Sequence, residues 1–261
     1  MGIFDKFRKI DTSDTQGVLG PDLAVLVSYT ATGVQLSPTN FRQLDAMTKS
    51  IRTLTTVAKS LPSAAYLGHN NGPAVVSTPH DLTDAQRSIL DSALRVDQAG
   101  EIAANYIYKG QLAVLGRDRK VGPLIQEMWD QEKKHLVVMD KLQVQHNVRP
   151  TVLSEVAKAA GFGLGVVTAL MGKEAAMACT EAVETVIGEH YDDQLKELDS
   201  FQTSHPSVPL LKSVIREFRD DELEHLDIAV VNHSQRAPAH ALLSSVVGGG
   251  CKIAIELCKR F

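Results

Sequence analysis

The chain has 261 residues and a formal net charge of −4, with acidic and basic residues interspersed, so its composition excludes an extended nucleic-acid surface. Its three cysteines are odd in number and form no C-x-x-C pair, which argues against a disulfide framework or zinc site and favours a reducing compartment. No apolar run reaches the roughly 20 residues of a spanning helix, and the length suits one domain with an appended segment.

We expect residues 1–80 to be an N-terminal extension and residues 81–261 to be the domain. Residues 46–80 contain no Asp or Glu, and basic residues lie among their Ser and Thr. The stretch "MTKSIRTLTTVAKSLPSAAYLG" begins at Met47 and has the composition of a mitochondrial transit peptide. An ordinary leader is the alternative. Met47 is a candidate true start, because residues 1–45 carry five Asp and fit neither interpretation.

After residue 80 the sequence predicts a series of helices. The first begins at Thr83 or Asp84, which are typical N-caps, and ends near "GRDRK" at about residue 115. Three more are predicted at about 121–146, 173–200 and 209–233, with two prolines in "FQTSHPSVP" breaking the chain before the last. The C-terminal "ALLSSVVGGGCKIAIELCKRF" is an apolar, helix-like tail. No strand-like alternation occurs, so the predicted fold class is all-α.

Two of these helices carry a Glu-x-x-His pair inside an apolar stripe. Glu132 and His135 interrupt the stripe of the second helix, and Glu222 and His225 interrupt that of the fourth. Three-residue spacing places both side chains of a pair on one helical face. A single Glu-x-x-His match is more often a feature of the protein surface. Two pairs in apolar stripes favour a shared polar site, because polar groups on a core-facing stripe need partners to offset desolvation.

The first and third helices each place one Glu in the corresponding stripe. These residues are Glu101 and Glu184, and Glu181, on a more polar face of the third helix, is the alternative to Glu184. The midpoints of the paired Glu positions fall in the two predicted turns, at residues 116–117 and 203. Antiparallel hairpins that close there bring each lone Glu level with the Glu-x-x-His of its partner helix, roughly 22 Å from the turn.

Four Glu and two His that converge in a bundle need a counter-ion, because close carboxylates repel one another. Two divalent metal ions would supply it, and this ligand pattern is that of ferritin-like di-iron or di-manganese bundles. Imidazole ligands favour iron-type metals over calcium or magnesium. The expected metal ligands are Glu101, Glu132, His135, Glu184, Glu222 and His225.

The stretches "LRVDQAGEIAANYIYKGQLAVLG", "MWDQEKKHL", "RPTVLSEVAKAAGFGLGVVTALMGKEAAMACTEAVE" and "FRDDELEHLDIA" together resemble the demethoxyubiquinone hydroxylase family. The resemblance covers about 82–261 and implies a ferritin-like di-iron monooxygenase of ubiquinone biosynthesis. Such an enzyme hydroxylates the ring of a polyprenylated demethoxybenzoquinone with O2 and electrons from NADH. The family's ligands fall on the same six residues, and no other catalytic residue is expected. His190 and Tyr191 match residues beside the iron pair, and Asp97 is a further candidate there.

The same resemblance implies a peripheral protein on the matrix side of the mitochondrial inner membrane, with a lipid-binding partner protein. An apolar segment at 159–172 supports a membrane contact, and it is too short to span a bilayer. Small residues recur every four positions at Ala157, Gly161, Gly165 and Ala169, which predicts close approach of another helix. With the C-terminal tail, this segment could form an entrance for a long isoprenoid chain. A buried core connector is the alternative.

Two other functions fit part of the pattern. A ferritin-like ferroxidase or iron store needs the same ligands but not the apolar segment. A metal-free membrane adaptor needs the apolar segment, and its six polar residues are merely hydrogen-bonded. No G-x-G-x-x-G nucleotide fingerprint is present, so the expectation of NADH rests on the resemblance alone.

Overall fold

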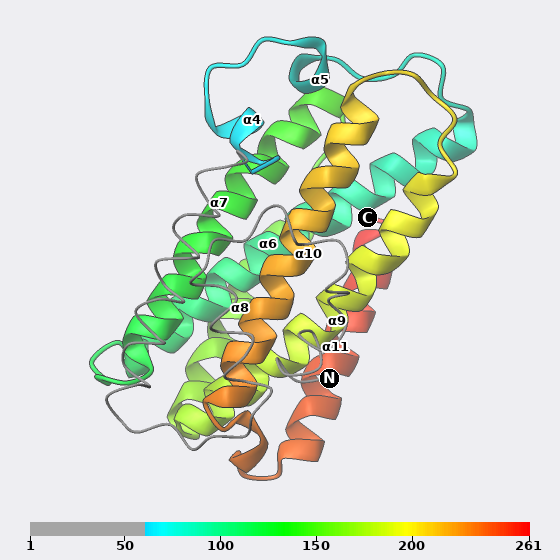
Figure 1. The fold of residues 1–261 in the computed structure, drawn as a ribbon. Helices are drawn as coiled ribbons and strands as arrows, with labels where there is room; N and C mark the ends of the chain where they lie inside the picture. Colours follow the sequence, from blue (N-terminus) through cyan, green and yellow to red (C-terminus); the bar gives the residue numbers. More distant parts are fainter. Residues whose placement is uncertain (1–60) are drawn as a thin grey trace, which may run out of the picture. The chain divides into compact units, whose positions relative to one another are not determined.

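A computed structural model describes residues 61–261. Within this range every regular element is a helix and no strand is present, which confirms the all-α prediction (Figure 1). The chain divides between Ser60 and Leu61 into two units. Most of the expected transit-peptide stretch, from Met47 to Ser60, lies outside the described residues.

Two antiparallel hairpins build a four-helix bundle (Figure 1). The four helices are α6 (Asp84–Leu115), α7 (Gly122–His146), α9 (Lys173–Asp199) and α10 (Ser207–Val231). The predicted N-cap of the first helix is Thr83. Its side chain accepts a hydrogen bond from the Gln86 N–H, and the Gln86 side chain accepts one from the Thr83 N–H, which forms a capping box.

The two hairpin turns have different local causes. Between α6 and α7, the Asp118 carboxylate accepts hydrogen bonds from the backbone N–H groups of Lys120 (2.7 Å) and Val121 (3.1 Å). Between α9 and α10, the prolines begin a helix instead of only breaking one: Pro206 is the N-cap of α10 and Pro209 lies in its first turn. A missing N–H costs little there, so α10 begins two residues earlier than predicted.

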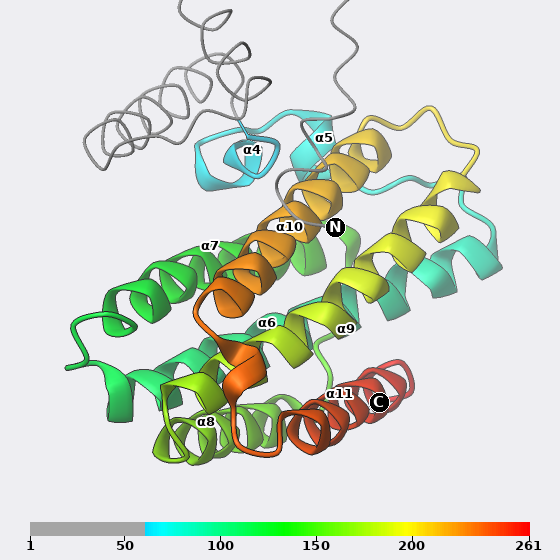
Figure 2. The same ribbon diagram turned by 60° about the horizontal axis from the view of Figure 1, so that its bottom comes forward.

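A further layer of two helices covers one face of the bundle. These helices are α8 (Ser154–Leu170) and α11 (His240–Cys258). Figure 2 shows both lying against α6 and α9, on the side away from α7 and α10, and the helix contacts agree with this arrangement. The sequence predicted an apolar segment and an apolar C-terminal tail in addition to the bundle. In the structure these are α8 and α11, and they form one layer.

The small-residue stripe of α8 packs directly on the backbone of α6. A Cβ on Gly165 would lie 2.1 Å from the carbonyl oxygen of Ile107, and one on Gly161 would lie 2.6 Å from that of Ala103. Gly110 of α6 faces α8 in the same way, because its Cβ would lie 2.4 Å from the Phe162 carbonyl oxygen. The predicted close helix approach is confirmed, and its partner is α6.

The opposite sides of α8 and α11 expose large apolar residues. Exposed side chains on the two helices are Val156, Phe162, Val167, Leu170, Leu242, Val246, Ile253 and Leu257. Helix α11 has a mean hydropathy of 1.5 over 18 of its 19 residues, so by length and composition it could cross a membrane. No spanning helix was expected from the sequence, because no apolar run reaches roughly 20 residues. One such helix is weak evidence for a span, but the exposed apolar area calls for an explanation.

Residues 61–80 lie against α7 and α10 through two short helices, α4 (Ala64–Leu67) and α5 (Pro73–Val76). The backbone N–H and the hydroxyl of Ser63 both donate to the Glu217 carboxylate, at 2.8 and 2.6 Å. The Tyr66 ring is buried, and its hydroxyl donates to Gln145 at 2.8 Å. The expected domain boundary at residue 80 stays a prediction, although these twenty residues make specific contacts with the bundle.

The α6–α8 contact predicts opposite effects for two neighbouring glycines. Gly165→Ala should lower the free energy of unfolding by about 1–3 kcal/mol, because its methyl group would enter the α6 backbone. Gly163→Ala is the matched control, since a Cβ there meets nothing within 4 Å. It should stabilise the protein by up to about 1 kcal/mol, because Ala is the better helix former. Denaturant unfolding measures both changes, and equal effects would contradict this packing.

Candidate metal centre

The six residues predicted as ligands come together in the middle of the bundle. Glu101 lies on α6, Glu132 and His135 on α7, Glu184 on α9, and Glu222 and His225 on α10, and all six side chains are buried. Their donor atoms form two overlapping groups, and within each group the atoms lie within 4.8 Å of one another.

The two groups share Glu132 and Glu222. Glu101 and His135 complete the first group, and Glu184 and His225 complete the second. We call these groups the His135 position and the His225 position. Each position thus has one carboxylate of its own, one imidazole and two shared carboxylates, which is the donor set of a two-metal carboxylate site.

Both imidazole rings turn Nδ1 toward the shared carboxylates. His135 Nδ1 lies 3.2 Å from a Glu222 oxygen, and His225 Nδ1 lies 3.0 Å from the other oxygen of Glu222. His225 Nδ1 is also 3.2 Å from Glu132. The Phe218 ring stacks on His135 with centroids 3.9 Å apart, which limits rotation of that imidazole. The ring nitrogens are therefore oriented for a ligand in the centre of the cluster.

The charges of this cluster are strongly perturbed. Burial and the neighbouring Glu132 raise the pKa of Glu101, and burial and Glu222 raise the pKa of Glu184. Burial also opposes ionisation of Glu222, yet the adjacent imidazoles of His135 and His225 hold its pKa at about 2. Not all four carboxylates can ionise together in this space without a cation.

Three buried atoms at the centre make no hydrogen bond: Glu101 Oε2, Glu132 Oε1 and His135 Nδ1. Buried polar atoms are normally satisfied, so unpaired ones indicate a missing partner. Carboxylate oxygens and imidazole nitrogens together suit iron and manganese better than calcium or magnesium. The residues therefore fit a pair of transition-metal ions.

The three residues expected beside the cluster form one group next to Glu101. The Tyr191 hydroxyl donates to Glu101 Oε1 at 2.8 Å. The Asp97 carboxylate, one helical turn before Glu101, contacts His190 Nε2 at 3.0 Å and accepts from Gln194 at 2.7 Å. His190 itself makes no hydrogen bond or ion pair with the six clustered side chains. It holds the buried Asp97 in place from a partly exposed position.

Sequence reasoning did not assign a role to three residues that touch the cluster. The Tyr108 hydroxyl donates to Glu184 Oε1 at 3.0 Å. The Nε2 atoms of His135 and His225 contact Asp221 and Gln131, respectively. A pattern could have revealed all three. Tyr108 follows Glu101 by seven residues, as Tyr191 follows Glu184, and the other two directly precede the Glu of each Glu-x-x-His pair.

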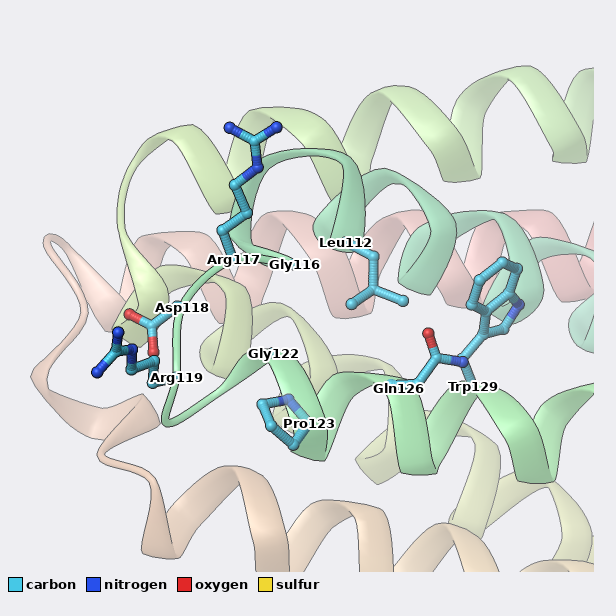
Figure 3. Close-up of a pocket in the computed structure, with 9 residues that line it drawn as sticks. All are labelled: Leu112, Gly116, Arg117, Asp118, Arg119, Gly122, Pro123, Gln126 and Trp129. Atoms are coloured by element: carbon cyan, nitrogen blue, oxygen red, sulfur yellow. The ribbon is translucent and has the colours of Figure 1, made fainter.

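The alternative carboxylate on α9 lies elsewhere. Glu181 contacts His240 Nε2 of α11 at 2.9 Å, and it belongs to neither metal-binding group. Two surface hollows among the described residues also lie outside the cluster. Figure 3 shows one at the α6–α7 turn, where side chains such as Arg117, Pro123 and Trp129 form its walls and none of the six clustered residues takes part.

Comparison with known proteins gives a consistent set of relatives. The family model described as "Ubiquinone biosynthesis protein COQ7" matches residues 88–258. The human NADPH-dependent 3-demethoxyubiquinone 3-hydroxylase, mitochondrial, is 49% identical over 198 residues, which cover 76% of this chain and 90% of the relative.

Relatives from yeast and bacteria carry related names. The 5-demethoxyubiquinone hydroxylase, mitochondrial, of Saccharomyces cerevisiae is 42% identical over 202 residues, covering 74% of this chain and 87% of the relative. The 3-demethoxyubiquinol 3-hydroxylase of Rhodospirillum rubrum is 44% identical over 173 residues, covering 66% and 79%.

The two carboxylates of α9 predict a clear difference in metal uptake. Glu184→Ala should lose one or both metal ions, because it removes the separate carboxylate of the His225 position. Glu181→Ala is the control and should keep full uptake, since it loses only the contact with His240. Iron per chain after anaerobic loading with Fe(II) measures the effect. Full iron occupancy in the Glu184→Ala protein would exclude Glu184 as a ligand.

Proposed function

Because the chain belongs to the family of the ubiquinone biosynthesis protein COQ7, we propose that it hydroxylates the ring of a demethoxyubiquinone. Membership confirms the resemblance that the sequence motifs indicated. The observation that carries the proposal is the buried cluster of four Glu and two His, with its two overlapping groups of donor atoms. The curated relatives are named hydroxylases of demethoxyubiquinone or its quinol, and the ligand pattern is that of a di-iron monooxygenase.

In this proposal the six clustered side chains hold two iron ions. Bound iron would supply the activation of O2, with electrons from an external donor. Glu132 and Glu222 belong to both groups and would hold the two ions close together. Tyr191 and Tyr108 each donate a hydrogen bond to one of the unshared carboxylates, Glu101 and Glu184, and so fix the orientation of those ligands.

The surroundings of the cluster would keep water away from the reaction. On one side, Ile125, Met128 and Met177 are fully buried and pack with the ring of Tyr108. On the other, Phe218 covers His135 and continues into the largest apolar cluster of the bundle. A dry pocket strengthens the electrostatic interactions within it and limits side reactions of activated oxygen.

The electron donor is a reduced nicotinamide nucleotide in this proposal. The sequence resemblance implies NADH, whereas the names of the animal relatives and of the Dictyostelium discoideum relative specify NADPH. The names of the yeast and Rhodospirillum rubrum relatives specify neither nucleotide. Both nucleotides therefore belong in the assay.

We also propose a site of action on a membrane. The exposed apolar sides of α8 and α11 would rest in one leaflet of the mitochondrial inner membrane, on the matrix side. The names of several relatives include the word mitochondrial, which supports this compartment. A polyprenylated quinone would enter from the lipid, and a lipid-binding protein of ubiquinone biosynthesis would be its presenting partner.

The two alternative functions explain less. A soluble ferroxidase or iron store gives no reason for the apolar layer of α8 and α11. A metal-free adaptor gives no reason for the unpaired Glu101 and His135 atoms at the centre. A hydroxylase that receives its substrate from the bilayer uses both features.

Oxygen incorporation tests the proposed reaction. The iron-loaded full-length protein, given a short-tailed demethoxyubiquinone, isotopically labelled O2 and either NADPH or NADH, should place one labelled oxygen atom in the ring. Glu222→Ala should abolish the product, because both positions lose a shared carboxylate. Mass spectrometry of the quinone gives the answer. Oxidation of Fe(II) without labelled quinone would favour a ferroxidase instead.

Membrane contact is tested by an exposed apolar residue of α8. Val167→Asp should weaken binding to lipid vesicles, because a charge in the leaflet costs on the order of 2–3 kcal/mol. Val144→Asp is the matched control, since Val144 is exposed on α7, in the layer away from α8 and α11. Flotation with vesicles and turnover of long-tailed and short-tailed quinones are the measurements. Val167→Asp should lose only long-tailed turnover, and unchanged flotation would contradict the proposal.

A further inference from the structure

The two halves of the cluster repeat each other residue by residue. Each position has its own Glu, one His and the same two shared Glu. Even the tyrosines are reciprocal: Tyr191 of the second hairpin donates to Glu101, and Tyr108 of the first hairpin donates to Glu184. Because these contacts match at 2.8 and 3.0 Å, neither tyrosine makes one position clearly different from the other.

The two halves differ in the residues that contact Nε2 of the two imidazoles. His135 Nε2 lies 3.0 Å from Asp221 Oδ2, and His225 Nε2 lies 2.9 Å from Gln131 Oε1. Asp221 and Gln131 occupy equivalent places, directly before Glu222 and Glu132, and each reaches across to the His of the other helix. The geometry is the same, but one acceptor is a carboxylate and the other is a neutral amide.

This difference acts on any metal bound at Nδ1. With Nδ1 directed at the cluster, Nε2 carries the proton and donates it to the residue behind. A carboxylate acceptor draws the proton more strongly than an amide oxygen does and makes the imidazole a more basic ligand. The carboxylate also adds a negative charge that favours a cation nearby. His135 is therefore the stronger donor of the two.

We propose that the two metal positions are inequivalent, and that Asp221 and Gln131 determine the order in which they fill. The His135 position binds the first divalent ion more tightly, and the His225 position binds the second. This inference rests on the metal centre of the proposed function, but it does not depend on the identity of the organic substrate.

Besides the Phe218 ring stacked on His135, a charged residue also differs between the two halves among the described residues. Asp97, held by His190 and Gln194, is one turn before Glu101, and the equivalent residue before Glu184 is Thr180. Asp97 adds negative charge on the same side as His135, so it acts in the same direction as Asp221. Asp97 makes no hydrogen bond to the imidazole of His135 or His225. Asp221 and Gln131 each contact one of these two imidazoles. Substitutions at residues 221 and 131 separate the two causes.

Stepwise metal titration of two nearly isosteric variants tests the proposal. The metal-free full-length protein is titrated anaerobically with Fe(II), and with Co(II) as a spectroscopic probe. Asp221→Asn should weaken the tighter step by about ten- to hundredfold and leave the weaker step nearly unchanged. Gln131→Glu should tighten the weaker step by a similar factor. Each substitution therefore reduces the difference between the dissociation constants of the two binding steps. Asp221→Asn does so by weakening the tighter step, and Gln131→Glu by tightening the weaker one.

Two neighbouring substitutions are the controls. Asp220→Asn removes a charge one residue from Asp221, where the side chain is exposed and pairs with Arg219. Gln126→Glu adds a charge to the surface hollow that Gln131 also lines. Neither residue hydrogen-bonds to an imidazole of the cluster. Both controls should therefore keep the wild-type difference between the dissociation constants of the two steps. Circular dichroism of the metal-free variants checks that the helices are intact.

The outcomes separate this inference from the function on which it rests. The inference would be overturned if the difference between the two dissociation constants stayed unchanged in both test variants. It would also be overturned if Asp221→Asn affected only the weaker step. Neither result would exclude the metal centre itself. No metal uptake by the wild-type protein would overturn both. Stepwise uptake with the expected shifts but without quinone hydroxylation would support the inequivalent positions and reject only the proposed reaction.

Discussion

The burial of four carboxylates in the middle of a helical bundle is the constraint on which the rest of this structure depends. Desolvation and mutual repulsion push the pKa values of Glu101 and Glu184 upward, and the two imidazoles offset only part of the negative charge. A pair of metal ions would resolve this conflict. The surrounding apolar side chains and the two tyrosines then serve to hold the carboxylates in one arrangement.

The bundle achieves this arrangement by repeating one hairpin. Each hairpin supplies a lone Glu from one helix and a Glu-x-x-His pair from the other, and both shared carboxylates belong to the pairs. The hairpins are also bound to each other by reciprocal hydrogen bonds from Tyr108 and Tyr191. Repetition gives two similar metal positions, and the exchange of a carboxylate for an amide behind one imidazole makes them chemically different.

In the proposed function, the outer layer of α8 and α11 would lie between the buried cluster and a lipid substrate. Helix α8 lies close enough to α6 for backbone-to-backbone contact, because Gly161 and Gly165 have no side chains. Helix α6 carries Glu101 and is covered by α8, so these two helices lie between the cluster and the exposed apolar side of α8. A quinone taken from a membrane would have to pass both this outer layer and the bundle helix beneath it to reach the cluster.

The helices and the six clustered residues could be predicted from local periodicity in the sequence. A spacing of three or seven residues fixes the helical face of Glu132 and His135 whatever lies around it, and hairpin midpoints fix their level. Tertiary structure alone decided which side chains meet across helices. The rotation of each helix about its axis selected Tyr108, Asp221 and Gln131 as neighbours of the cluster, and it set Glu181 against His240. The repeated spacing could have suggested Tyr108, Asp221 and Gln131 as candidates, but packing between distant segments decides which contacts form.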